Sequence, residues 1–232
     1  MSHDSNIPAS EDGHDGTEVL DPFEIRVLAV LAEKEGLTPD SYPLSLNALT
    51  NGCNQLSSRD PVMAMSEEAV QDALLRLIQK RFVLEVRQAG ARVVKYEHRM
   101  RIEWTLEQDK VAILTILMLR GVQTAGEIRA RSGRLYELAS LADVEAGLQF
   151  LIDKFPPLAA RLARAPGAKE VRYAHLLSGE DVLKQQELIG NIAPMHESRQ
   201  DRVAHLENEV ARLRSEIDAL TEQFAKFRRQ FE

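Results

Sequence analysis

The chain has 232 residues, of which 44% are hydrophobic and 28% are charged, as is ordinary for a globular protein of one large or two small domains. The net charge of -7 argues against a uniformly basic nucleic-acid binder, and a single cysteine excludes an internal disulfide or a cysteine-based zinc site. No apolar run reaches the ~18 residues of a membrane span. Because the polar start also lacks the apolar core of a secretory signal, we expect a cytoplasmic protein without a membrane partner.

The first 20 residues are predicted to be a disordered acidic tail. They hold five acidic residues and no Lys or Arg, and Gly, Ser and His make up much of the rest. Most of the net charge of -7 is therefore confined to this tail. In the remaining chain, Lys and Arg are in excess over residues 76–101 and 154–172, which weakens the argument from net charge against a nucleic-acid partner.

Residues 21–103 are predicted to form a first domain of three helices followed by a β-hairpin. Each helix start is marked by a first-turn proline or by a side chain that can cap free backbone N–H groups. The three starts carry Asp21-Pro22, Pro43 and Ser66. The hairpin follows over residues 82–87 and 93–96, which are rich in β-branched residues and flank a turn with a glycine. This order is typical of a winged helix-turn-helix domain.

Residues 104–180 are predicted to repeat this pattern as a second domain. Helices are expected at about 107–119, 124–132 and 140–154, the first being a core helix, and a hairpin follows. In the third helix of each unit, Val70, Leu74, Leu77 and Ile78 align with Val144, Leu148, Leu151 and Ile152. At the end of each hairpin, Lys95 to His98 align with Arg172 to His175. The predicted fold class is therefore mainly α with small β-hairpins (α+β), as two tandem winged helix-turn-helix domains.

A linker is predicted over residues 181–198 and a coiled-coil helix over residues 199–232. Apolar residues alternate at spacings of three and four through about four heptads. The residues assigned to the dimerisation seam are Val203, Leu206, Val210, Leu213, Ile217 and Leu220. β-branched residues at a with leucine at d favour a parallel homodimer, although Phe224, Phe227 and Phe231 are large for its last turns. The alternative is a helix that folds back on its own domains.

Several motifs resemble the YceH family of bacterial proteins. They are Tyr42 to Leu49 (YPLSLNAL), Cys53-Asn54-Gln55, Arg59 to Met63, Lys95 to Arg99 and Arg172 to Leu177. The similarity covers roughly residues 20–180. It implies two tandem winged-helix domains, in agreement with the internal repeat, and it supplies no activity.

The sequence contains no catalytic motif that we recognise, so we expect no enzyme activity, cofactor or metal. There is no phosphate-binding glycine loop, nucleophile elbow or zinc-protease motif. His98 and His175 hold equivalent positions in the repeat and are interpreted as structural. Cys53 is interpreted as a packed thiol, because no histidine lies near it in the sequence.

We favour a dimeric DNA-binding protein, such as a transcriptional regulator, over a protein-interaction scaffold. Winged helices commonly place the third helix in the major groove and the hairpin on phosphates. The expected contacts with double-stranded DNA are Arg76, Gln79, Lys80, Arg87, Arg92, Lys95, Arg161, Arg164 and Lys169. The acids at the starts of both third helices oppose this interpretation: Glu67, Glu68 and Asp72, and Asp143, Glu145 and Asp153.

A block of polar residues near the second helix is the other candidate contact surface. Its members are Asn47, Asn51, Asn54 and Arg59. The three asparagines are spaced by four and three residues and so share one helix face. The alternative is that they cap helices and satisfy loop backbone groups.

Overall fold

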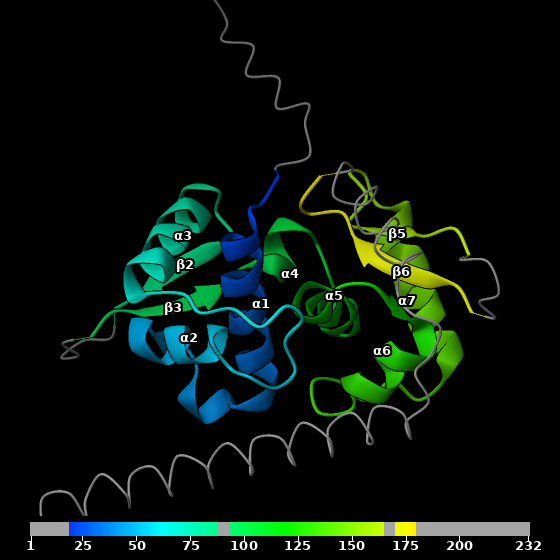
Figure 1. Cartoon of the computed structure of the whole chain (residues 1–232), viewed down its shortest axis with the longest axis horizontal. Helices are drawn as coiled ribbons and strands as arrows, with labels where there is room; N and C mark the ends of the chain where they lie inside the picture. The colour runs from blue at the N-terminus through cyan, green and yellow to red at the C-terminus, as the bar shows by residue number, and fades with distance from the viewer. Residues whose placement is uncertain (1–18, 88–92, 165–169, 180–232) are drawn as a thin grey trace, which may run out of the picture. The chain divides into compact units, whose positions relative to one another are not determined.

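The computed structural model describes residues 19–87, 93–164 and 170–179 (Figure 1). The predicted acidic tail lies almost entirely outside these ranges. The predicted linker and coiled coil, with all six seam residues, lie outside them as well.

The first half of the described chain contains four helical segments and one small sheet. The elements are α1 (Pro22–Leu37), the 3₁₀ helix η1 (Pro39–Ser41), β1 (Leu44–Ser45), α2 (Leu46–Cys53), α3 (Glu67–Gln79), β2 (Val83–Val86) and β3 (Lys95–His98). The strands form an antiparallel sheet in the order β1-β3-β2. The predicted hairpin is therefore joined by a third strand of only two residues, too short to show the alternation by which strands are recognised in a sequence.

The second half repeats this order after one additional short helix. Its elements are α4 (Met100–Glu103), α5 (Gln108–Arg120), β4 (Gln123–Thr124), α6 (Ala125–Ser132), α7 (Leu141–Asp153), β5 (Ala159–Arg161) and β6 (Arg172–His175). The sheet order, β4-β6-β5, matches that of the first half. Equivalent tyrosines occupy equivalent registers, since Tyr96 lies opposite Leu44 and Tyr173 lies opposite Gln123.

Side-chain caps start most of these helices, as the sequence predicts. Asp21 accepts hydrogen bonds from the backbone N–H groups of Phe23 and Glu24. Ser66 accepts one from Ala69 at the start of α3. One start was predicted too early: α2 begins at Leu46 behind the cap Ser45, because the residues just after Pro43 pair with β3 as a strand.

The core is shared by the two halves through α1 and α5, which lie side by side (Figure 1). Residues 24–33 of α1 and 111–119 of α5 are all buried, so the predicted core helix in the second half is confirmed. A helix buried on every side has no amphipathic stripe, and this explains the continuous apolar run in the sequence. Backbone bonds also join the halves, from Asp60 N–H to Leu119 O (2.9 Å) and from Leu20 N–H to Leu177 O (2.8 Å).

The structure is therefore mixed α+β with two small antiparallel sheets, as predicted at this level. The division at residue 103 into separate domains stays a prediction, since both halves contribute to one hydrophobic cluster. Over the described ranges, every helix is too short or too polar to cross a membrane.

Candidate interaction surfaces

The outer face of α3 is acidic. Its apolar stripe, Val70, Ala73, Leu74 and Leu77, is buried against the rest of the first half. The opposite face exposes Glu67, Glu68, Gln71, Asp72, Leu75 and Gln79. Three carboxylates and no cation thus occupy the face that a winged helix would turn toward a ligand.

Two basic residues that were predicted to contact DNA bind the start of α1 in the structure. Arg76 Nη2 lies 2.7 Å from Asp21 Oδ2, and Lys80 Nζ lies 3.0 Å from the carboxylate of Glu24. Lys80 also donates to the backbone oxygen of Val19 at 3.1 Å. Because Glu24 is only 1% exposed, these cations compensate a buried charge and hold α3 against α1.

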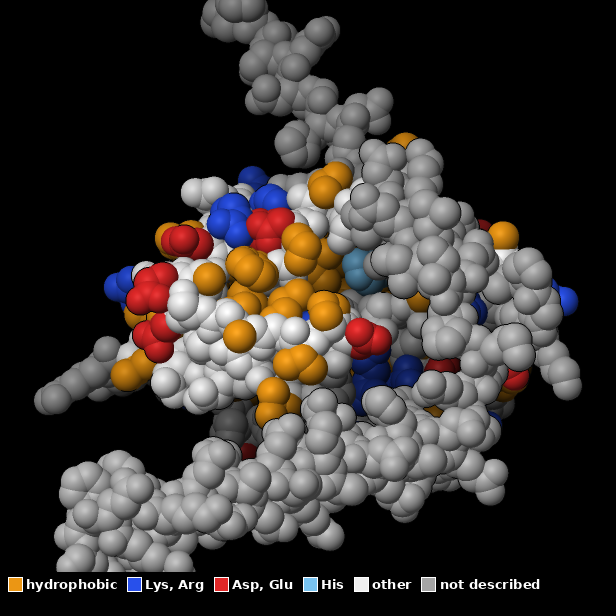
Figure 2. All heavy atoms as spheres, viewed as in Figure 1, with side chains coloured by type: hydrophobic (Ala, Val, Ile, Leu, Met, Phe, Trp, Pro, Cys, Tyr) orange, Lys and Arg blue, Asp and Glu red, His pale blue; other side chains and the backbone are white. Residues whose placement is uncertain are grey.

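Four apolar side chains on α1, α3 and the segments next to them are exposed, and we call them the apolar patch. They are Val19, Phe23, Val62 and Leu75, each between 43% and 54% exposed. Figure 2 shows hydrophobic side chains gathered over α1 and over the segment that links α2 to α3. Sequence reasoning missed this patch, because Val62 lies in a loop and Phe23 in a buried helix, and no local pattern joins them.

The outer face of α7 repeats the character of α3. It exposes Leu141, Ala142, Asp143, Glu145, Ala146, Gln149, Phe150 and Asp153, again with three carboxylates and no cation. It also borders a cavity of about 450 Å³. The cavity is lined by Asp109, Lys110, Tyr136, Glu137, Leu138, Ala139, Asp143, Ala146, Gly147 and Phe150, and we call it the α7 groove.

Two aromatic rings and three acids define the chemistry of the α7 groove. Tyr136 and Phe150 are 41% and 42% exposed. Lys110, the one cation in the lining, is already paired with acids on α5 and at its N-cap, since its Nζ lies 3.0 Å from Asp109 Oδ2 and 2.5 Å from Glu107 Oε2. That ammonium is also 5.4 Å from the centre of the Phe150 ring, and the ammonium of Lys154, outside the lining, is 5.5 Å from the same ring. The lining therefore keeps a net negative charge beside exposed aromatic surface.

The cations predicted on the hairpins are divided between the described and undescribed parts of the chain. Arg87, Arg161 and Arg164 are exposed, and Lys95 is half-buried. The Arg87 guanidinium lies 3.4 Å from Glu85, a pair exposed to water. The other two predicted cations, Arg92 and Lys169, lie outside the described residues.

The predicted polar surface divides into exposed and structural members. Asn47 and Asn51 are exposed, and the Asn51 amide donates to Asn47 Oδ1 at 3.2 Å. Asn54 instead exchanges two hydrogen bonds with the backbone of Met65, at 2.8 and 2.7 Å. It therefore holds the end of α2 to the segment that precedes α3.

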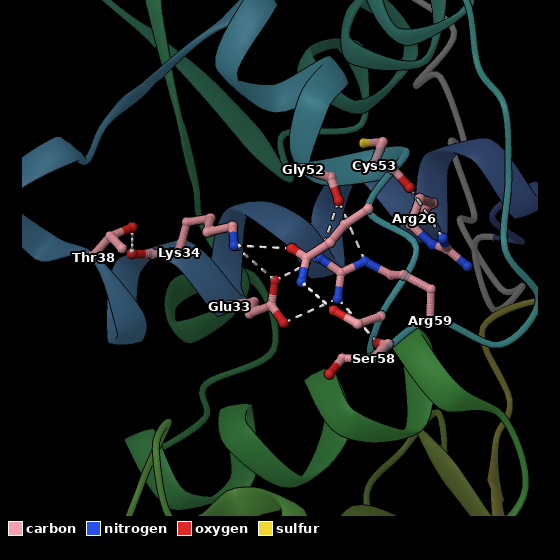
Figure 3. A network of polar contacts seen from close by, with 10 residues as sticks. Arg26, Glu33, Lys34, Thr38, Gly52, Cys53, Ser58 and Arg59 are labelled. Atoms are coloured by element: carbon pink, nitrogen blue, oxygen red, sulfur yellow. Dashed lines mark hydrogen bonds and ion pairs between the residues drawn. The ribbon is translucent and has the colours of Figure 1, made fainter.

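Arg59, the fourth member of that surface, is buried (6% exposed) and holds the segment between α2 and α3 in place (Figure 3). Its guanidinium binds both carboxylate oxygens of Glu33, at 3.0 and 2.6 Å, and the backbone oxygen of Gly52. Arg26 lies close by and donates to the backbone oxygens of Cys53 and Pro61. Burial and the neighbouring Arg59 charge lower the pKa of Arg26. These arginines are structural, and Arg59 is not available to a partner.

His98 and Cys53 have structural surroundings. His98 Nε2 lies 2.9 Å from Glu35 Oε2, and this hydrogen bond lowers the pKa of Glu35. Burial raises the pKa of the Cys53 thiol to about 12, so at neutral pH it is not a thiolate nucleophile. Within the described ranges, no three His, Cys, Asp or Glu side chains are grouped so that they could hold a metal ion.

The fold and these surfaces define a mixed α+β protein of two similar halves, each with an acidic outer third helix. Residues 20–168 match the family described as "Protein of unknown function, DUF480". The UPF0502 protein of Herminiimonas arsenicoxydans is 66% identical, over 92% of this chain and 91% of the relative. That of Janthinobacterium sp. (strain Marseille) is 63% identical over 98% of both chains, and that of Azoarcus sp. (strain BH72) is 52% identical over 92% of this chain and 94% of its own. The chain belongs to this bacterial family, in agreement with the resemblance found in its sequence motifs.

Proposed function

We propose that this chain is a non-enzymatic protein-binding protein with two winged-helix modules, dimerised by its C-terminal coiled coil. The observation that carries the proposal is the acidic and apolar outer face of both third helices. Each module has the order of helices and strands expected of a winged helix. Fold alone does not determine the ligand of such a module, so the argument rests on the surface.

Electrostatics oppose the major groove as the ligand of these helices. DNA binding requires Lys and Arg to neutralise phosphates, whereas Glu67, Glu68 and Asp72 would face them. Arg76 and Lys80 could compensate only by leaving the start of α1. Their departure would leave the buried Glu24 carboxylate without a cation, with only the Asp21 backbone N–H as a partner, which is typically costly by several kcal/mol.

The same faces have the composition of a protein interface. Leu75 belongs to the apolar patch and lies among the carboxylates of α3, and Phe150 lines the α7 groove. Apolar and aromatic side chains within a polar rim are typical of interfaces that bind protein.

Site-specific photo-cross-linking in bacterial cells tests this function. A photoreactive amino acid replaces Leu75 on α3, and the matched control replaces Leu84, which is similarly exposed on β2 (50% and 46%). We expect a discrete protein adduct from position 75 and none from position 84. Equal adducts at both positions, or none at 75, would contradict the proposal.

Double-stranded DNA is the second candidate, favoured by the exposed Arg87, Arg161 and Arg164 on the hairpins. Titration of the full chain with random duplex at several salt concentrations separates the two functions. Binding that weakens steeply with salt, and weakens further in an Arg161→Ala, Arg164→Ala variant, would favour DNA. Absence of binding at low salt would remove that candidate.

A further inference from the structure

We propose that the α7 groove receives the C-terminal segment, residues 224–231, of a second copy of this chain. The inference rests on the proposed protein-binding function and names a partner for one of its surfaces. The groove requires an occupant that offers apolar or aromatic side chains to Tyr136 and Phe150. The occupant must also bring positive charge to Glu137 and Asp143.

The sequence FAKFRRQF at residues 224–231 has both properties. It contains Phe224, Phe227 and Phe231, and its charged residues are Lys226, Arg228 and Arg229, with no acid among its eight residues. Aromatic rings gain from contact with other rings beyond the area they bury. Arginine beside a carboxylate adds a charge-assisted hydrogen bond.

The predicted coiled coil brings a second copy within reach of the groove. Pairing of two chains over residues 203–220 keeps the partner's last residues, as well as the chain's own, at high effective concentration near each groove, and the isotope labels in the experiment below separate the two. The three phenylalanines are large for the seam that they would otherwise continue. The chain from residue 179 to residue 203 can span roughly 80 Å when extended, and a helix from residue 203 to residue 224 is only roughly 30 Å long, so chain length does not restrict the contact.

Photo-cross-linking of purified full-length chains tests this contact directly. A benzophenone amino acid replaces Phe150, unlabelled and ¹⁵N-labelled chains are mixed and allowed to exchange, and the adducts are mapped by mass spectrometry. We expect adducts that join the α7 peptide of one isotope to the C-terminal peptide of the other. The same substitution at Phe155, which is 91% exposed and outside the groove lining, should yield none.

Several outcomes overturn the inference. Adducts confined to one isotope would place the segment of the same chain in the groove. Adducts to another region of the chain would equally contradict the proposal. If the same variant is cross-linked in cells and captures only a different protein, this inference fails while the proposed function stands. If position 75 captures no protein in cells, the proposed function fails, whatever position 150 captures.

A charge exchange tests the electrostatic part of the contact. Glu137 is exposed, and no ion pair joins it to any described residue, so Glu137→Arg should leave the melting temperature unchanged. Glu137→Arg or Arg228→Glu alone should lower the adduct yield at position 150 by about two- to fivefold, as expected for one exposed pair. The double variant should recover it. Equal adduct yields in the starting protein, the two single variants and the double variant would show that charge attraction does not hold the segment in the groove.

Discussion

At the residue scale, two histidines hold equivalent positions at the ends of β3 and β6 but meet opposite surroundings. His98 is paired with the Glu35 carboxylate. His175 Nδ1 is buried, without a hydrogen-bond partner among the described residues. Burial lowers the pKa of His175 to about 4 because an imidazolium there would lose its hydration.

The depressed pKa of His175 predicts a loss of stability in mild acid. The unfolded chain takes up a proton near pH 6.5, whereas folded His175 does so only near pH 4. The contribution of His175 to the free energy of unfolding is therefore complete above pH 6.5 and falls by about 3 kcal/mol toward pH 4. His175→Leu should remove this part of the pH dependence. Urea unfolding of both proteins at pH 7.5, 6 and 5 measures it, and a constant difference between them would refute the assignment.

A second residue-scale prediction concerns the buried pair of Glu33 and Arg59. Glu33→Gln leaves the buried Arg59 charge without its carboxylate partner and removes one of the two carboxylates near Arg26, the other being Asp60. We expect a loss of about 3–5 kcal/mol in the free energy of unfolding. The control is Glu85→Gln, which removes an exposed partner of Arg87 and should cost less than about 1 kcal/mol. If urea unfolding gives comparable losses of unfolding free energy for the two variants, the Glu33–Arg59 pair does not hold the segment between α2 and α3 in place.

At the element scale, α1 and α2 approach closely where α2 has no side chain. A Cβ atom on Gly52 would lie 2.6 Å from Val30 Cγ1, a fully buried and β-branched side chain. Because valine has few alternative rotamers in a helix, the two helices must separate to admit a methyl group.

Gly52→Ala is therefore expected to destabilise the protein by about 1–3 kcal/mol. The matched control is Gly126→Ala on α6, where the nearest atom to a new Cβ is Thr124 Oγ1 at an ordinary 3.8 Å. There the better helix propensity of alanine should stabilise by up to about 1 kcal/mol. Thermal melting of the two variants gives the sign of each effect. A higher melting temperature in both variants would mean that α1 and α2 can separate without cost to admit the methyl group.

At the scale of the whole molecule, the predicted assembly depends on the heptad pattern. Leu213→Asp puts a carboxylate into the predicted seam and should convert a dimer into a monomer. Ala211→Asp adds the same charge at a position outside the seam and should leave the dimer intact. Solution mass by light scattering distinguishes them. A monomeric wild-type chain, or a dimeric Leu213→Asp variant, would show that the coiled-coil dimer is wrong.

The sequence alone determined the local order of this protein, and only the tertiary structure decided how its charges and halves are used. Caps such as Asp21 and Ser66, and the buried run in α5, were predictable because their signals span only a few residues. The shared core of α1 and α5, the pairing of Arg76 with Asp21 and the burial of Arg59 join residues far apart in the chain. The local sequence does not indicate whether an arginine on a helix faces a ligand or a carboxylate of another helix. Only the packing of the helices distinguishes the two.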